Sequence, residues 1–345
     1  MVKFLCISVI GSPDDPAELE NKLRRDLQTS REAALEPSTK KNLEIQWFNF
    51  TNFSKRLGKP PYPISLDTLC LYAQYLTSQV KSPTTIRNYI SGICTIIHVK
   101  GGDAPNLSSP IFKLTMKGIT KVMQHRIKQA KPITPRILSD IYNILDHSNS
   151  FHIALWAALL LGFLLLLRKS NLVPDSRSKI DPKKLIMGEK LTLTPEAAIV
   201  SLTWTKTHQT GAHIIQVPLL KIPGSVLCPI KAIEAIEQTI GIKQGHPLFR
   251  YLDKRGQPKT LTYPQLNGAI KQLVSSTGRD GSKFTSHSLR RGGANFAFKI
   301  GLPGEHIQAL GNWASDAYKV YIDNPLETRT RAAAKIKKSL KKQNY

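Results

Sequence analysis

An uncharged apolar run, IALWAALLLGFLLLL at residues 153–167, constrains the fold of this 345-residue chain more than any other feature. Its length falls short of the roughly 20 residues that a bilayer core requires, so we do not expect a membrane span. Because the run is apolar on every side, it predicts a helix buried all round, which ends at Arg168. A guanidinium that is partly buried at such a helix end needs an anionic partner.

The charge of the chain points to a polyanion as that partner. There are 49 Lys and Arg residues against 24 Asp and Glu residues, which gives a net charge of +25. A surplus of this size repels itself unless a polyanion lies nearby, and nucleic acid is the natural candidate. A hydrophobic content of 41% is enough to build a packed core in each of two domains.

The cysteines and short motifs exclude several other classes. Cys6, Cys70, Cys94 and Cys228 lie far apart without a C-x-x-C pair, which argues against a zinc site or a disulfide framework and fits a reducing compartment. No metal-ligand cluster and no phosphate-binding G-x-x-x-x-G-K-[ST] loop is evident, so we expect neither a metal nor ATP. The first residues lack the cleavage site of a signal peptide. We expect no cofactor and no small-molecule substrate.

Punctuation by proline, glycine and serine divides the chain into three parts. We expect a charged N-terminal lead-in at residues 1–36, a helical domain at 37–130 and a second domain at 131–345. Basic, proline-punctuated residues 128–136 read as the interdomain linker. Four helices are expected in the second part, each beginning at or just after a serine: 38–57, 65–80, 82–99 and 109–129.

Exposed basic side chains on these four helices predict a DNA-facing surface. Each lysine alone is more simply a solvated helix face, and only their sum carries the prediction. The residues concerned are Lys40, Lys41, Arg87, Lys117 and Lys121.

The third part mixes helices with a small sheet. Helices are expected at 137–147, through the apolar run, and from Pro229 to the end. Between them, alternating segments at 190–194, 198–206 and 212–219 predict strands, the last two as a hairpin. The fold class is therefore mainly α with a small antiparallel β-sheet, an α+β chain.

The segment TSHSLRRGGANFAFKIG carries the first group of candidate site residues. We expect Ser286 to cap a helix whose first turn holds His287 and Arg290, three positions apart and thus on one face. The free N–H groups and the dipole at that helix end favour a phosphate. Gly292 and Gly293 weaken a helix, so we expect another segment to pack closely against the backbone there.

The segment GNWASDAYKVYIDNP carries the second group. The indole of Trp313 closes a helix and has one N–H to donate, which suits a phosphate oxygen as well as a core contact. Tyr318 and Tyr321 lie three apart on one face, so their spacing does not decide which one is a nucleophile. Tyr321 lies nearer the break at Asn324 and Pro325, where a helix end can shift.

The order of these residues resembles the tyrosine recombinase, or phage integrase, family, over residues 150–330. It is most similar to recombinases of eukaryotic Crypton-type mobile elements. The resemblance implies that residues 37–130 are a helical DNA core-binding domain and that 131–345 are an integrase-like catalytic domain. It also implies a homo-tetramer on double-stranded DNA that uses neither metal nor ATP. The residues that carry it are Arg168, Lys206, His287, Arg290, Trp313 and Tyr321.

The resemblance also implies a role for each residue. Arg168 and Arg290 would grip the scissile phosphate, and His287 and Trp313 would complete that grip. Guanidiniums suit this task because they bind phosphate in a bidentate way and stay charged.

Two further residues would act as the general acid and the nucleophile. Lys206 would protonate the leaving 5′ oxygen, with His208 as a possible substitute. Tyr321 would attack phosphorus to give a 3′-phosphotyrosine link, since it matches the signature, while Tyr318 packs. A phenol of pKa near 10 needs such help at neutral pH.

One position departs from the family pattern, and alternatives stay open. The family has an acid three positions after the first arginine, where this chain has Asn171. That change favours the alternative of a domesticated regulator or architectural protein that binds DNA without cutting it. A type IB topoisomerase is a third reading. The basic tail KIKKSLKK, residues 335–342, together with the eukaryotic resemblance, predicts a nuclear location.

Overall fold

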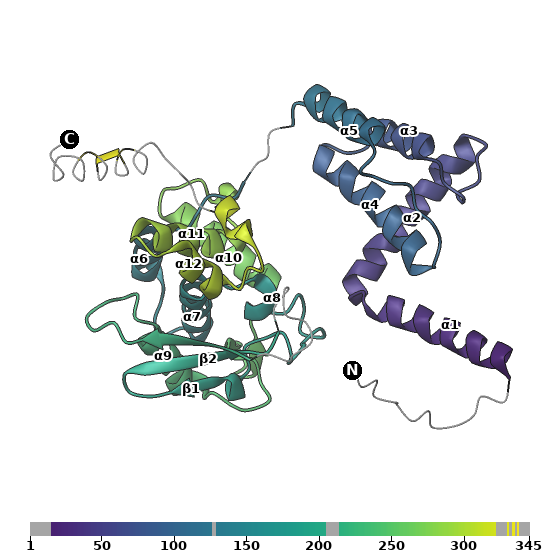
Figure 1. Ribbon diagram of the computed structural model, residues 1–345. Helices are drawn as coiled ribbons and strands as arrows, with labels where there is room; N and C mark the ends of the chain where they lie inside the picture. Colours follow the sequence, from purple (N-terminus) through teal and green to yellow (C-terminus); the bar gives the residue numbers. More distant parts are fainter. Residues whose placement is uncertain are drawn as a thin grey trace, which may run out of the picture. The chain divides into compact units, whose positions relative to one another are not determined.

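The chain forms two compact units, residues 1–127 and 128–345. The computed structural model describes residues 15–125, 129–204 and 214–321, together with positions 330, 333, 334 and 337. Figure 1 shows helices throughout both units and strands in the second one, so the prediction of a mainly α chain with a small antiparallel sheet is confirmed.

The first unit is helical throughout its described residues. Four of its helices begin with proline, whose missing N–H costs nothing at a helix start. The helices are α1 Pro16–Ala33, α2 Pro37–Arg56, α3 Leu66–Leu76, α4 Pro83–Val99 and α5 Pro110–Met123.

Serine caps occur at two of the four predicted positions. The side-chain oxygens of Ser65 and Ser82 accept bonds from backbone N–H groups at the starts of α3 and α4. The expected cap at Ser38 is wrong, because α2 begins after Glu36. Ser109 directly precedes α5, as expected, but its side chain makes no cap bond. Proline at the first helical position already removes one of the free donors there.

Aromatic packing joins α2 to α3. Phe50 and Tyr72 are fully buried, and their ring centroids lie 5.1 Å apart in an edge-to-face arrangement. In contrast, α1 buries no side chain, and Leu19, Leu23 and Leu27 on it are exposed. The packed core of the unit therefore starts with α2.

The second unit surrounds α7 with helices and two small sheets. Its α-helices are α6 Pro135–Ile144, α7 Ser150–Leu164, α8 Lys169–Leu172, α9 Pro229–Ile240, α10 Tyr263–Ser276, α11 His287–Lys299 and α12 Gly304–Gly311. Its 3₁₀ helices are η1 Gly188–Lys190, η2 Gly281–Lys283 and η3 Asp316–Tyr321. Its strands are β1 Leu191–Leu193, β2 Ala197–Leu202, β3 Ile215–Leu220, β4 Arg250–Leu252 and β5 Pro258–Thr260.

Helix α7 is the central element that the apolar run predicts. It contacts α9, α11, α6 and β4, and Figure 1 shows it inside the unit between α12 and the sheet. The predicted end at Arg168 is wrong, because α7 stops at Leu164 and Leu166 has a left-handed φ of 50°. This turn makes Arg168 the residue that precedes α8. Among the described residues, no helix is both long enough and apolar enough to cross a membrane.

The predicted hairpin forms the larger sheet. Strand β2 lies between β1 and β3, antiparallel to both, with Val200 opposite Leu191 and Val217. A second hairpin, β4–β5, lies where helices were expected after Pro229. Its strands are three residues long, too short to show an alternating pattern.

The predicted linker is partly wrong, because its second half belongs to the second unit. The backbone N–H of Lys131 donates to the carbonyl of Lys283 at 2.8 Å, and that of Ile133 donates to the carbonyl of Ser288 at 3.0 Å. Ile133 is fully buried, and α6 begins only two residues later. Residues 131–134 therefore pack against the start of α11.

Candidate active site

Helix α11 carries two of the predicted site residues in its first turn. The expected cap at Ser286 is wrong: its backbone is already helical, and its side chain makes no cap bond. Instead, the backbone N–H of His287 donates to the hydroxyl of Thr285 at 3.2 Å. The start of the helix is therefore fixed one residue earlier than predicted, while His287 and Arg290 still share a face.

Arg290 is buried, with only 1% of its surface exposed, and the backbone holds it on two sides. Its Nη1 donates to the carbonyl of Leu166, and its Nη2 donates to the carbonyl of Gly311 at 2.7 Å. Its Nε is also buried and has no hydrogen-bond partner among the described residues. The guanidinium is thus anchored yet keeps an unsatisfied donor.

Trp313 covers one face of this guanidinium. The Cζ atom of Arg290 lies 3.8 Å from the centre of the Trp313 ring, a cation–π stack. Gly311 allows the approach, because a Cβ atom there would lie 1.7 Å from the indole. Asn312, with a left-handed φ of 50°, turns the chain at the end of α12. Trp313 therefore supports Arg290, and its own contact with a phosphate stays a prediction.

The phenol ring of Tyr321 lies among the predicted site residues. Its ring centroid is 5.0 Å from that of His287 and 5.4 Å from that of Trp313, and 5.7 Å from the Cζ atom of Arg290. The side-chain amide of Asn295, on α11, donates to the carbonyl of Tyr321 at 2.8 Å. Sequence reasoning missed Asn295; its one signal is a polar residue among the apolar positions of α11.

Tyr318 has different surroundings, although it lies in the same 3₁₀ helix. It is 8% exposed, and its ring packs 6.3 Å from that of Trp313. A Cβ atom on Gly304 would lie 2.3 Å from its hydroxyl, so the phenol is wedged against the start of α12. The structure gives Tyr318 and Tyr321 different surroundings, whereas their spacing in the sequence did not distinguish them. The assignment of Tyr321 as the nucleophile stays a prediction.

Arg168 completes a pair of guanidiniums. It is half-buried, and burial lowers its pKa, which the nearby phenol of Tyr321 partly offsets. Burial, followed by the charge of Arg168, also lowers the pKa of Arg290, and the phenol of Tyr321 again offsets part of the effect. No carboxylate of the described residues forms an ion pair with either arginine. Two neighbouring cations in poor contact with water make this a site for an anion.

The same environment favours the neutral form of His287. Loss of hydration lowers its pKa, and the positive charges of Arg290 and Arg168 lower it further. The residue nevertheless remains exposed to solvent. A neutral imidazole beside the phenol has a free ring nitrogen that accepts a proton.

Lys206 and His208 lie outside the described residues, so their predicted role as proton donor stays a prediction. The last described residue before them is Trp204. Its carbonyl accepts a hydrogen bond from the side chain of Asn171.

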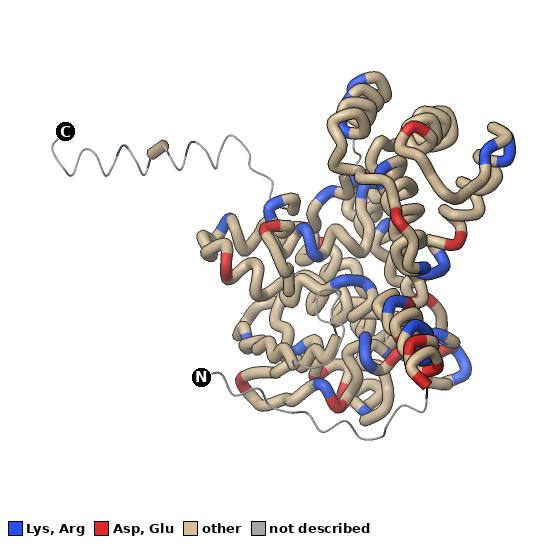
Figure 2. Tube along the Cα trace, turned by 45° about the vertical axis from the view of Figure 1, so that its right-hand side comes forward, with Lys and Arg blue, Asp and Glu red and all other residues tan. Residues whose placement is uncertain are grey.

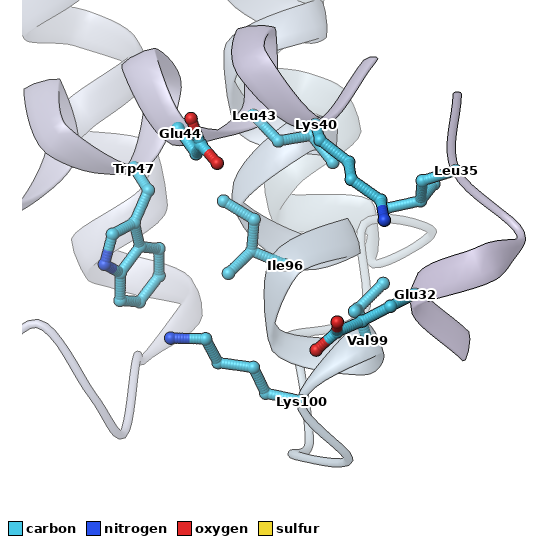
Figure 3. A pocket seen from close by; sticks show the side chains of 9 residues that line it. All are labelled: Glu32, Leu35, Lys40, Leu43, Glu44, Trp47, Ile96, Val99 and Lys100. Carbon is cyan, nitrogen blue, oxygen red and sulfur yellow. The ribbon is translucent and has the colours of Figure 1, made fainter. Parts of the chain in front are cut away.

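The predicted DNA-binding residues of the first unit do not form one patch. Arg87, near the start of α4, donates to Thr120 on α5 at 3.4 Å, which places it beside Lys117 and Lys121. Lys40 instead lines a pocket of about 280 Å³ with Trp47 and residues at the opposite end of α4 (Figure 3).

Lysines and arginines are spread over the traces of both units in Figure 2. Lys41, at the start of α2, is exposed. Contact of these residues with DNA stays a prediction. No group of three or more His, Cys, Asp or Glu residues in the described part of the chain is arranged to hold a metal ion.

No protein-family model matches the sequence, and no curated protein matches it. Solved structures do match the fold. The Tn1549 transposon integrase, residues 82–397 in complex with circular intermediate DNA, is 14% identical with a TM-score of 0.57; the match covers 89% of this chain and 98% of that chain.

Two further structures agree. A lambda integrase dimer, residues 75–356 bound to a COC′ core site, is 14% identical with a TM-score of 0.53, covering 88% of this chain and 95% of that chain. The XerH site-specific recombinase bound to a palindromic difH substrate is 12% identical with a TM-score of 0.53, covering 84% and 76%. The chain therefore has the fold of tyrosine recombinases and integrases.

Proposed function

We propose that the protein is a site-specific DNA recombinase that cuts and rejoins double-stranded DNA through a 3′-phosphotyrosine intermediate. One observation carries the proposal: Tyr321 lies beside His287 and beside a pair of arginines that has no carboxylate partner among the described residues. A phosphodiester supplies the missing negative charge. The fold of DNA-bound recombinases supports the same reading.

In the proposed reaction, the oxygen of Tyr321 attacks phosphorus while its proton passes to His287. Arg168 and Arg290 stabilise the extra negative charge of the five-coordinate transition state. Because Arg290 is already fixed by two backbone carbonyls and by Trp313, little reorganisation is needed when the phosphate binds.

The bond from phosphorus to the 5′ oxygen breaks in the same step. Lys206 gives its proton to that oxygen, so a 5′ hydroxyl leaves and the 3′ phosphate stays on Tyr321. Attack by a 5′ hydroxyl from the same or another duplex reverses the step and rejoins the strand, without metal or ATP.

Assembly and setting are part of the proposal. We propose that four copies act together on two duplexes, and that the protein works in the nucleus as the recombinase of a Crypton-type mobile element. The basic segment at residues 335–342 and the sequence resemblance support the nuclear setting.

A covalent-capture experiment tests the proposed chemistry. Since the target sequence is unknown, the substrate is a library of duplexes with a randomised centre and a nick near it, so that cleavage releases a short strand and traps the enzyme. We expect an adduct that survives a denaturing gel and selects one sequence. Tyr321→Phe abolishes the adduct, and Tyr318→Phe, the matched control, retains it.

The alternative function is a regulator that binds DNA without cutting it. Sequence-selective binding with no adduct from any library member would establish that alternative. An adduct that persists in Tyr321→Phe but is lost in Tyr318→Phe would move the nucleophile to Tyr318.

A further inference from the structure

Asn171, the residue that departs from the family pattern, is a buried junction between three segments. It is 2% exposed and lies in α8, three positions after Arg168. Its side-chain Nδ2 donates to the carbonyl of Lys184 at 2.9 Å and to that of Trp204 at 3.0 Å. Both amide hydrogens are therefore used to hold the backbone of other segments.

The backbone of Asn171 strengthens this junction. Its N–H donates to the carbonyl of Arg168 at 2.9 Å, and its carbonyl accepts from the N–H of Ile186 at 3.1 Å. One residue thus ties the turn that carries Arg168 to the segment before β1 and to the end of β2.

The sense of these hydrogen bonds requires an amide. Both side-chain partners are carbonyl oxygens, which only accept, and an ionised carboxylate has no hydrogen to donate. The acid that the family pattern places here would face two carbonyls and repel them. In this fold, Asn171 therefore performs a task that an acid would not perform.

Two more contacts fix the same end of β2. The hydroxyl of Thr203 donates to the carbonyl of Lys183 at 3.0 Å, and the Nζ atom of Lys184 lies 4.8 Å from the ring centre of Trp204. Lys206 follows Trp204 by two residues in the sequence.

We propose that Asn171 is a positioning residue, whose amide fixes the start of the segment carrying Lys206 relative to Arg168. The proposal rests on the proposed function, in which Lys206 protonates the leaving 5′ oxygen. Asn171 touches no reacting atom in this scheme and acts only through Trp204.

A substrate that needs no proton donor tests this role. The adduct-forming duplex selected from the nicked library is prepared with oxygen, and separately with sulfur, at the scissile 5′ bridging position. A thiolate leaves without protonation because thiol pKa values lie near 8.5, far below that of an alcohol. We expect Asn171→Asp to slow adduct formation on the oxygen substrate on the order of tenfold to a hundredfold, and to match the wild type on the sulfur substrate.

The matched control is Asn149→Asp. The Asn149 side chain caps α7 by accepting bonds from the N–H groups of Phe151 and His152, and a carboxylate accepts them equally well. This variant should match the wild type on both substrates. Thr203→Val, which removes the neighbouring tie, should repeat the Asn171→Asp pattern more weakly and gives a second variant if Asn171→Asp does not fold.

Each other outcome overturns a specific claim. An equal loss on both substrates means that Asn171 acts through Arg168 or the fold as a whole, and no loss on oxygen means that it positions nothing. A wild-type protein that forms no adduct on either substrate overturns the proposed function instead.

Hydrogen exchange tests the junction independently of catalysis. Backbone amide exchange at the end of β2 should accelerate in Asn171→Asp but not in Asn149→Asp. Unchanged exchange in Asn171→Asp would overturn the junction itself.

Discussion

At the scale of one residue, Gly292 shows why α11 contains a glycine where it passes the backbone of Ile133. A Cβ atom on Gly292 would lie 1.8 Å from the carbonyl oxygen of Ile133, which belongs to a backbone that is itself hydrogen-bonded to α11. Since that backbone has no room to move away, we expect Gly292→Ala to lower the free energy of unfolding by about 2–4 kcal/mol. Urea unfolding of the two proteins measures the difference.

Gly268 provides the control in the same unit. It lies inside α10, and a Cβ atom there would meet no other atom within 4 Å. Gly268→Ala should therefore raise the free energy of unfolding by about 0.5–1 kcal/mol, because alanine is the better helix former. A Gly292→Ala protein as stable as this control would contradict the close approach of Ile133.

His287 predicts how the reaction depends on pH. Its pKa is lowered by loss of hydration and by the charges of Arg290 and Arg168, so the neutral ring persists below its ordinary pKa of about 6.5. The rate of adduct formation should therefore fall on the acid side with a midpoint below pH 6.5. Single-turnover rates between pH 5 and 8 measure it.

The same residue allows a direct check of that assignment. His287→Gln keeps a polar side chain but has no titrating ring, so the acid-side fall should disappear and the remaining rate should be lower. A midpoint above pH 6.5, or an acid limb that survives in His287→Gln, would show that another group accepts the proton.

At the scale of elements, the sequence predicted most helices and the main hairpin because these are long and periodic. It placed the end of the apolar helix at Arg168, whereas the left-handed turn at Leu166 ends α7 earlier and brings the Leu166 carbonyl to Arg290. Such a turn depends on its tertiary partners, so no local pattern announces it. The β4–β5 hairpin was not predicted for the same reason, since its three-residue strands are held by pairing with each other rather than by a local pattern.

The site was predictable in its residue types and not in its internal support. The chemistry of phosphoryl transfer asks for arginines, a proton acceptor and a phenol, and spacing put His287 and Arg290 on one face. The carbonyls that hold Arg290, the amide of Asn295 beneath Tyr321, and the donor role of Asn171 come from contacts between distant segments. Only a folded chain shows which hydrogen-bond sense each position needs.

Helix α1 makes a testable element because it buries none of its own side chains. We expect a chain that begins at Glu36 to unfold at the same urea concentration as the full chain, within about 0.5 kcal/mol of stability. Phe50→Ala is the contrast: its ring is fully buried, and its loss should cost about 3–5 kcal/mol. A clear loss of stability on removing α1 would mean that the helix packs against a surface of the chain.

At the scale of the whole molecule, the charge surplus lies mainly in the second unit. Residues 1–127 hold 17 basic and 10 acidic residues, a net charge of +7, and residues 128–345 hold 32 and 14, a net charge of +18. Each unit has its own buried core, so each can be measured as a separate fragment. The fragment of the second unit should therefore bind DNA with the stronger salt dependence.

Binding to an arbitrary 30-bp duplex tests this distribution, since each phosphate that a lysine or arginine neutralises releases a counterion. We expect the affinity of the full chain to fall by about 10³ or more between 50 and 200 mM salt. Residues 129–345 should keep the larger part of that slope, and residues 15–127 the smaller part. Tyr321→Phe should leave the slope unchanged, because it alters the chemistry and not the charge. If the affinity of the full chain changes less than tenfold over this range, its lysines and arginines face water rather than phosphates. The case for a DNA enzyme would then rest on the active site alone.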